Sequence, residues 1–130
     1  MGLLFDTHTF IWLDSAAHKL PQSLIDYLNV STQSKVLSTV VPWEMQIKAS
    51  LGKLELHDDL ATIVQQQVQG NHFAILPVML EHVYALADLA EHHKDPFDRL
   101  LVAQARVEGH TIVTNDAVIQ RYDVPTLWRP

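Results

Sequence analysis

Short apolar runs alternate with amphipathic segments along this chain, and the alternation predicts a layered fold. Four runs have the length and composition of buried strands, and a fifth, shorter one lies near the end; they span 3–5, 36–41, 73–76, 111–113 and 124–128. Between them, apolar residues recur at helical spacing over 7–13, 21–29, 42–51, 58–69, 83–90 and 95–108. Strands that alternate with helices favour an α/β fold with a mostly parallel central sheet of four to five strands flanked by helices.

Prolines and glycines indicate where these elements end. Pro42 is expected to end the second strand and to open the helix that follows. Gly52, Gly70 and Gly109 are expected to stop three of the helices, because glycine is favoured just past a helix end. The glutamines at 65–67 lie opposite the apolar stripe of their helix, so we expect this face to be solvated.

Composition narrows the class of protein. A chain of 130 residues that is 48% hydrophobic is long enough for one domain, here 1–130, and too short for two ordinary ones. It has no cysteine, so oxygen or histidine nitrogen must hold any metal ion. No apolar run reaches the roughly 20 residues of a membrane span and no signal peptide is evident, so we expect a cytoplasmic protein without membrane contact. The net charge of −6 argues against a broad basic surface.

Four acidic residues lie where a strand ends or where the following helix begins. Asp6 and Asp116 follow strands, and Glu44 and Asp98 fall in the first turns of helices. Because parallel strands present their carboxyl ends at one edge of a sheet, we expect these acids to converge. Each also has a purely structural explanation: a helix cap for Asp6, compensation of the helix dipole for Glu44 and Asp98, and a turn for Asp116.

A shared pocket of carboxylates needs a counter-charge, because like charges raise one another's pKa values. Magnesium or manganese satisfies this need, since both ions prefer oxygen ligands and keep several waters. Such a site can activate water and stabilise charge on a phosphodiester. We therefore expect Asp6 and Asp98 to ligate a metal, and Glu44 and Asp116 to ligate it directly or through water, with one of these two as the alternative general base.

Four segments, in this order and spacing, resemble the PIN-domain family, specifically the VapC-type ribonuclease toxins. They are LLFDTHTFIWL, WEMQIK, HHKDPFDRLLVAQA and HTIVTND. The resemblance implies a single PIN fold, magnesium- or manganese-dependent endoribonuclease activity on RNA, homodimerisation and inhibition by a cognate antitoxin. The family's four acids match Asp6, Glu44, Asp98 and Asp116. The third match is supported by Ala103 and Ala105 at the offsets of the family's D-x-x-x-x-A-x-A pattern.

Two positions near these motifs qualify the resemblance. Asp95 belongs to the D-P-F-D-R pattern of the subgroup, and we expect it to be an auxiliary residue that caps the helix starting at Pro96. The subgroup has a small hydroxyl residue two positions before the tryptophan, whereas this chain has Val41 followed by Pro42. Glu44 is therefore expected to be held differently here.

Three other interpretations deserve comparison. A phosphoacceptor receiver domain would need an adjacent acidic pair after the first strand, but Thr7 follows Asp6. A zinc site at His92 and His93 is disfavoured because there is no H-E-x-x-H motif, and a solvated loop or an RNA contact is the better interpretation. A non-catalytic interaction module stays open, because an acidic pocket also binds a basic segment of a partner such as an antitoxin arginine.

Basic and aromatic residues supply the candidates for substrate and partner contacts. The candidate RNA contacts are Lys48, Lys53, Lys94, Arg99 and Arg121. We expect Trp12, Trp43 and Trp128 to be core or dimer contacts and not platforms for stacking bases.

Overall fold

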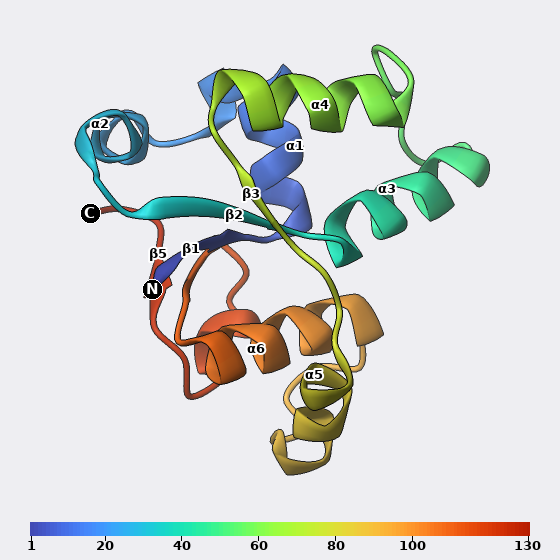
Figure 1. Cartoon of the computed structure of the whole chain (residues 1–130), viewed down its shortest axis with the longest axis vertical. Helices are drawn as coiled ribbons and strands as arrows, with labels where there is room; N and C mark the ends of the chain where they lie inside the picture. The colour runs from blue at the N-terminus through green and yellow to red at the C-terminus, as the bar shows by residue number, and fades with distance from the viewer.

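A computed structural model describes residues 1–130 and shows a five-stranded sheet between helices (Figure 1). The strands are β1 (Gly2–Phe5), β2 (Ser34–Ser38), β3 (Ala74–Leu76), β4 (Thr111–Val113) and β5 (Thr126–Leu127). They lie in the order β3-β2-β1-β4-β5, and every neighbouring pair is parallel. The predicted α/β class and the mostly parallel sheet are confirmed.

Helices connect the strands and cover both faces of the sheet. The α-helices are α1 (Thr7–Ser15), α2 (Gln22–Val30), α3 (Val40–Ser50), α4 (Leu60–Gly70), α5 (Leu80–Ala85) and α6 (Pro96–Glu108). Three short 3₁₀ turns, η1 (Ala17–Lys19), η2 (Leu86–Asp88) and η3 (Ile119–Arg121), complete the connections. In Figure 1, α1 and α4 lie on one side of the sheet and α5 and α6 on the other. None of the helices combines the length and the apolar character that crossing a lipid bilayer requires.

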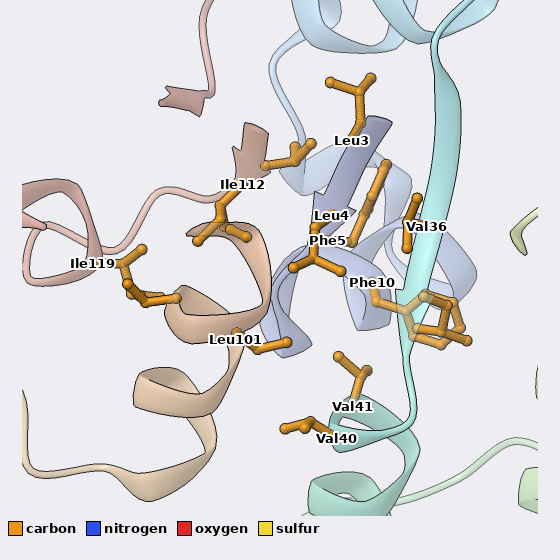
Figure 2. Close-up of a cluster of buried hydrophobic side chains, with 14 of the residues drawn as sticks. Leu3, Leu4, Phe5, Phe10, Val36, Val40, Val41, Leu101, Ile112 and Ile119 are labelled. Atoms are coloured by element: carbon orange, nitrogen blue, oxygen red, sulfur yellow. The ribbon is translucent and has the colours of Figure 1, made fainter. Parts of the chain in front are cut away.

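The core forms around β1, which is buried along its whole length. Its side chains meet those of α1, β2, β4 and α6 in one apolar cluster (Figure 2). Phe73 packs edge-on against Phe5 and Phe10, with ring centroids 5.0 and 5.6 Å away. A central strand buried on both faces explains why the first run of the sequence is continuously apolar.

The second strand is shorter than predicted. It ends at Ser38, and Val40 and Val41 lie buried in the first turn of α3. Pro42 is the third residue of that helix. A proline is tolerated there because the first backbone N–H groups of a helix have no intrahelical acceptor. The expectation that Pro42 divides strand from helix was wrong for this reason.

The remaining boundaries agree closely with the periodicity. Gly109 adopts the left-handed conformation with φ 74° and ends α6, and Gly52 has φ 71° just past α3, which confirms both predicted stops. Gly70 is the last residue of α4, one position earlier than a stop residue. The helix expected over 83–90 begins earlier, at Leu80, and finishes as η2.

One glutamine of the face expected to be solvated is buried. Gln67 is 8% exposed, and its amide nitrogen donates to Asp14 Oδ1 at 3.0 Å. Its Oε1 accepts from Asn71 Nδ2 at 2.6 Å, and Asp14 Oδ2 lies 2.7 Å from His57 Nε2. This polar network holds α4 and the preceding loop against α1, and hydrophobic periodicity alone does not predict it.

Candidate active site

The strand order creates a crevice at the carboxyl end of the sheet. From β1 the chain continues through β2 to β3 in one direction, whereas β4 and β5 lie on the other side of β1. In open parallel sheets, ligands bind at this kind of switch point, outside the carboxyl ends of the two central strands. Asp6 directly follows β1, and Asp116 lies three residues after the end of β4.

Asp6 combines a structural bond with a place in this crevice. It is 4% exposed and caps α1, since its Oδ1 accepts from the backbone N–H of Thr9 at 2.9 Å. Its Oδ2 accepts from Thr114 Oγ1 at 2.5 Å. Thr114 Oγ1 in turn accepts from the backbone N–H of Asp116 at 2.9 Å. One hydroxyl therefore fixes the spacing between two of the acids.

Asp116 uses one carboxylate oxygen in a turn, and its other oxygen lies on the side of His93. Its Oδ1 accepts from the backbone N–H groups of Val118 and Ile119 at 2.8 and 3.0 Å, as the turn interpretation indicates. Its Oδ2 lies 4.0 Å from His93 Nε2. The side chain is 35% exposed, so this second oxygen can meet a ligand.

Glu44 is held by two partners within the chain. It is 4% exposed; Oε1 accepts from Thr7 Oγ1 at 2.6 Å, and Oε2 pairs with Lys48 Nζ at 2.8 Å. The hydroxyl of Thr7 comes from α1 and supports the carboxylate although Val41 and Pro42 carry none. The ammonium of Lys48, one helical turn along α3, compensates its charge.

Asp98 and His93 are in contact, and with Asp116 they form a group that we call the acidic cluster. Asp98 Oδ2 lies 2.9 Å from His93 Nε2, and His93 Nδ1 accepts from the backbone N–H of Asp95 at 3.2 Å. The proton of a neutral imidazole therefore sits on Nε2 and points at Asp98. Ligand atoms of His93, Asp98 and Asp116 all lie within 4.8 Å of one another. His93 is thus part of the acidic cluster; it lies in the loop before α6 with its side chain 22% exposed, and the predicted RNA contact stays a prediction.

The electrostatics of the cluster favour protons or cations. Burial, and after it the carboxylates of Asp95, Glu44, Asp116 and Asp6, raise the pKa of Asp98 from 3.8 to about 8. Burial also raises the pKa of Asp6, although hydrogen bonds from Thr114 and Thr9 oppose the rise. Asp98 therefore lies within electrostatic reach of the other three sequence-predicted acids, and ligand atoms of Asp98 and Asp116 alone of the four share the 4.8 Å group with His93.

Asp95 lies at the edge of this cluster as the N-cap of α6. Its Oδ1 accepts from the backbone N–H groups of Phe97 and Asp98 at 2.8 and 3.2 Å. His92, next to His93, is not in the cluster, and its ring packs edge-on against Tyr122 with the centroids 4.9 Å apart. Asp95 therefore stabilises the helix that presents Asp98 and contributes negative charge beside it.

The candidate RNA-contacting cations fall into two groups. Lys48 pairs with Glu44, and the Arg99 guanidinium donates to the carbonyls of Ala90 and Leu86 at 3.0 and 3.4 Å. Both side chains are thus engaged within the chain. The others are exposed on the surface: Lys53, Lys94 and Arg121.

The three tryptophans differ in burial. Trp12 and Trp128 are half-buried against the core, with ring centroids 6.1 Å apart. Trp43 is 54% exposed and packs edge-on against Phe97 with the ring centroids 4.9 Å apart, so it lies outside the core, and a dimer contact stays the prediction for it. A pocket of about 250 Å³ opens beside Trp12, between the start of α1 and the segment after β4.

The donor set fits a hard divalent cation. The cluster offers several carboxylate oxygens and one imidazole nitrogen, and no thiolate is present. Magnesium and manganese take oxygen ligands, and manganese also accepts imidazole. Sequence reasoning missed two side chains that order this donor set, Thr7 and Thr114, and it considered His93 only as a zinc or RNA candidate. Thr7 and Thr114 stand in the segments LLFDTHTFIWL and HTIVTND, but the pattern assigned no role to either hydroxyl.

Comparison with known proteins gives one family and one group of structures. The family model for the PIN domain matches residues 3–125. The chain is similar to VapBC2 from Rickettsia felis, crystallised with a fragment of promoter DNA, at TM-score 0.75 and 17% identity over 98% of this chain and 99% of that one. No curated protein sequence matches the chain significantly.

Two further crystal structures show the same fold. DNA-bound VapBC from Salmonella typhimurium matches at TM-score 0.72 and 18% identity, covering 98% of this chain and 97% of that one. FitAcB from Neisseria gonorrhoeae matches at TM-score 0.67 and 17% identity, covering 96% of each chain. Each likeness extends over nearly the whole length of both chains.

Proposed function

Because the chain belongs to the PIN-domain family, we propose that it is a metal-dependent endoribonuclease and the toxin of a toxin–antitoxin pair. The observation that carries the proposal is the cluster of His93, Asp98 and Asp116, whose ligand atoms lie within 4.8 Å of one another. Burial of Asp98, followed by the charges of Asp95, Glu44, Asp116 and Asp6, raises the pKa of its carboxyl group to about 8. This concentration of negative charge is best relieved by a cation.

Each residue in and around the cluster has a separate proposed role in the reaction. Asp98 and Asp6 would hold the ion, and Asp116 and Glu44 would complete its ligand sphere directly or through water. A bound magnesium or manganese ion supplies charge for the phosphate oxygens and lowers the pKa of an attacking water. Asp116 is the better general base of the last two, since its side chain is 35% exposed while Glu44 is buried and paired with Lys48. Thr7 and Thr114 hold the acids in place through hydrogen bonds.

Cleavage of single-stranded RNA by the purified protein tests this function. The wild-type chain, supplied with magnesium or manganese, should cut RNA, and EDTA should stop it. Asp98→Asn should abolish cleavage while circular dichroism shows an unchanged fold. Asp88→Asn is a matched control, because Asp88 is an exposed acid at the end of η2 and should leave the rate unchanged. Cleavage by Asp98→Asn at the wild-type rate would contradict the proposal.

The partners follow from the same family placement. Three of the similar structures are named as VapBC or FitAcB complexes, and this supports a cognate antitoxin for this chain.

An exposed apolar surface on α5, made of Leu80, Val83 and Tyr84, supports a homodimer. The toxin would act in the cytoplasm, where its RNA substrate lies. Light scattering of the purified chain measures the dimer, and Leu80→Lys should weaken it.

A non-catalytic interaction module is the second candidate, and the charge of the cluster favours it. An arginine from a partner would pair with Asp98 and Asp116 and replace the cation. A wild-type protein that binds a basic peptide tightly but cuts no RNA in either metal would support this candidate over the nuclease.

A further inference from the structure

A pocket lies beside the acidic cluster and contains residues that the hydrolytic site does not use. It has a volume of about 250 Å³ and is lined by Asp6, His8, Thr9, Trp12, Asn115 and Asp116. Asp116 belongs to the cluster with His93 and Asp98, and Asp6 is a proposed metal ligand, so the pocket and the site share a wall. Pockets for drug-sized ligands measure about 300–1,000 Å³. This one therefore suits a single small ligand unit whose neighbouring group reaches the cluster.

Two rings on α1 give the pocket an aromatic wall. His8 and Trp12 lie four residues apart, on the same face of the helix. Their ring centroids are 6.1 Å apart and their planes are tilted by 51°, so the rings are not stacked on each other. Trp12 is also packed against Trp128 and the core, which fixes its orientation. The pocket thus has a rigid aromatic platform with the exposed ring of His8 at its rim.

The charges around the pocket fit a neutral ring with an anionic chain once a metal ion offsets the lining carboxylates. Lys19 Nζ lies 5.8 Å from the centroid of the Trp12 ring, outside the residues that line the pocket. Asp6 and Asp116 line the pocket, so the phosphates of such an occupant would depend on the ion proposed at the cluster and on Lys19 for attraction. On the opposite wall, the exposed amide of Asn115 offers one acceptor and two donors to the edge of such a ring.

We propose that this pocket binds one unstacked nucleobase of single-stranded RNA, adjacent to the phosphate that is cut. The base lies against Trp12 and His8, and Asn115 pairs with its edge. For Trp12 this replaces the expectation that the tryptophans are not platforms for stacking bases, because its ring lines the pocket beside Asp6 and Asp116. Single-stranded RNA is recognised in this way, by stacking on aromatic side chains and hydrogen bonding to exposed base edges. The inference rests on the proposed ribonuclease function, which it deepens by making α1 a determinant of substrate choice.

Nuclear magnetic resonance tests the pocket without any catalysis. Uridine monophosphate and adenosine monophosphate, added to the magnesium-loaded protein, should each shift the Trp12 indole N–H and the Asn115 side-chain amide. Inorganic phosphate should leave both signals in place, because it has no ring. Equal shifts with phosphate, shifts produced by Nα-acetylarginine amide but not by nucleotides, or no shift at Trp12 would overturn the proposal.

Cleavage kinetics test the role of the pocket in substrate binding. Trp12→Leu keeps apolar volume but loses the ring, and it should raise KM for single-stranded RNA on the order of tenfold with kcat largely retained. Trp12→Phe should recover most of the loss, and melting curves separate this effect from misfolding. His8→Ala should raise KM similarly. His18→Ala, an exposed histidine outside the pocket, is the matched control and should not change KM.

These measurements separate the two proposals. Wild-type cleavage with unchanged KM in Trp12→Leu and His8→Ala would overturn the base pocket and leave the ribonuclease function standing. If nucleotides shift the Trp12 signal but the protein cuts no RNA, the base pocket stands and the ribonuclease function is overturned. A tenfold KM effect that Trp12→Phe does not recover would also count against stacking, because phenylalanine presents a ring at the same position.

Discussion

At the scale of single residues, the acidic cluster shows how one side chain serves both the fold and the chemistry. Asp6 caps α1 and borders the crevice, and Asp116 closes a turn while its second oxygen stays exposed. The structural and the functional explanations of these acids are therefore compatible. A carboxylate has two oxygens, each with two lone pairs, so capping leaves capacity for a ligand.

The raised pKa of Asp98 predicts a gain in stability when its charge is removed. The group binds its proton more tightly in the folded chain, with a pKa of about 8, than in the unfolded chain, where it is near 3.8. The unfolded state thus binds fewer protons between these values, and the stability of the wild type falls as pH rises through them. Asp98→Asn should raise the melting temperature in EDTA by about 5 °C or more near about pH 8.

That gain should shrink as the pH falls. Near about pH 4 the folded wild type carries the proton on Asp98, so the variant and the wild type should melt almost together. Calorimetry across the range measures both limits. A stabilisation that is equally large at both ends would contradict the assignment of the shift to Asp98.

Thr7 gives a second prediction at this scale. Thr7→Val removes the hydroxyl that donates to the buried Glu44 Oε1, at nearly constant volume. The free energy of unfolding should fall by about 1–3 kcal/mol, because a buried acceptor loses its partner. RNA cleavage should also weaken. Thr39→Val is the control, because Thr39 is exposed and makes no capping hydrogen bond, and it should match the wild type in urea unfolding and in cleavage.

At the scale of the elements, α6 illustrates what local sequence determines. Asp95 and Pro96 begin the helix and Gly109 ends it, as their residue types predict. These signals act within a few residues, so the chain pattern contains them completely. The start of α3 was misjudged because Val40 and Val41 are apolar and β-branched, and their burial against the core overrides that local preference.

The end of α6 gives a prediction for this element. Gly109→Ala places a β-carbon on a residue with φ 74°, which should cost about 1 kcal/mol of unfolding free energy. Gly70→Ala is the matched control, because Gly70 ends α4 without a positive φ and nothing lies within 4 Å of an added β-carbon. Urea unfolding should show the loss at 109 and no loss at 70.

At the scale of the whole molecule, the convergence of acids followed from one topological rule, and the details of the cluster did not. The carboxyl ends of parallel strands lie at one edge of the sheet, so the strand pattern alone predicts that Asp6 and Asp116 lie near each other. The bonds from Thr7 to Glu44 and from Thr114 to Asp6 join residues 37 and 108 positions apart. No periodicity encodes such pairs, so they and the place of His93 became visible only in the folded chain.

Metal binding should stabilise the whole chain, since a ligand that binds only the folded state raises its melting temperature. Manganese or magnesium should increase the melting temperature of the wild type, and more so near about pH 8 than near about pH 6, because protons compete for Asp98 below its pKa of about 8. Calorimetry with EDTA as reference measures this. The increase should be largely absent in Asp98→Asn, and an equal increase there would place the ion elsewhere.

The two outer strands of the sheet limit how copies of this chain can assemble. β3 has three residues and is followed by Pro77, and β5 has two and is preceded by Pro125. Edge strands this short expose few unpaired backbone N–H and C=O groups to which another strand could bind. The flanking prolines have no N–H group to donate. Copies of this chain should therefore assemble through helical surfaces, and edge-to-edge pairing of sheets from different molecules is disfavoured.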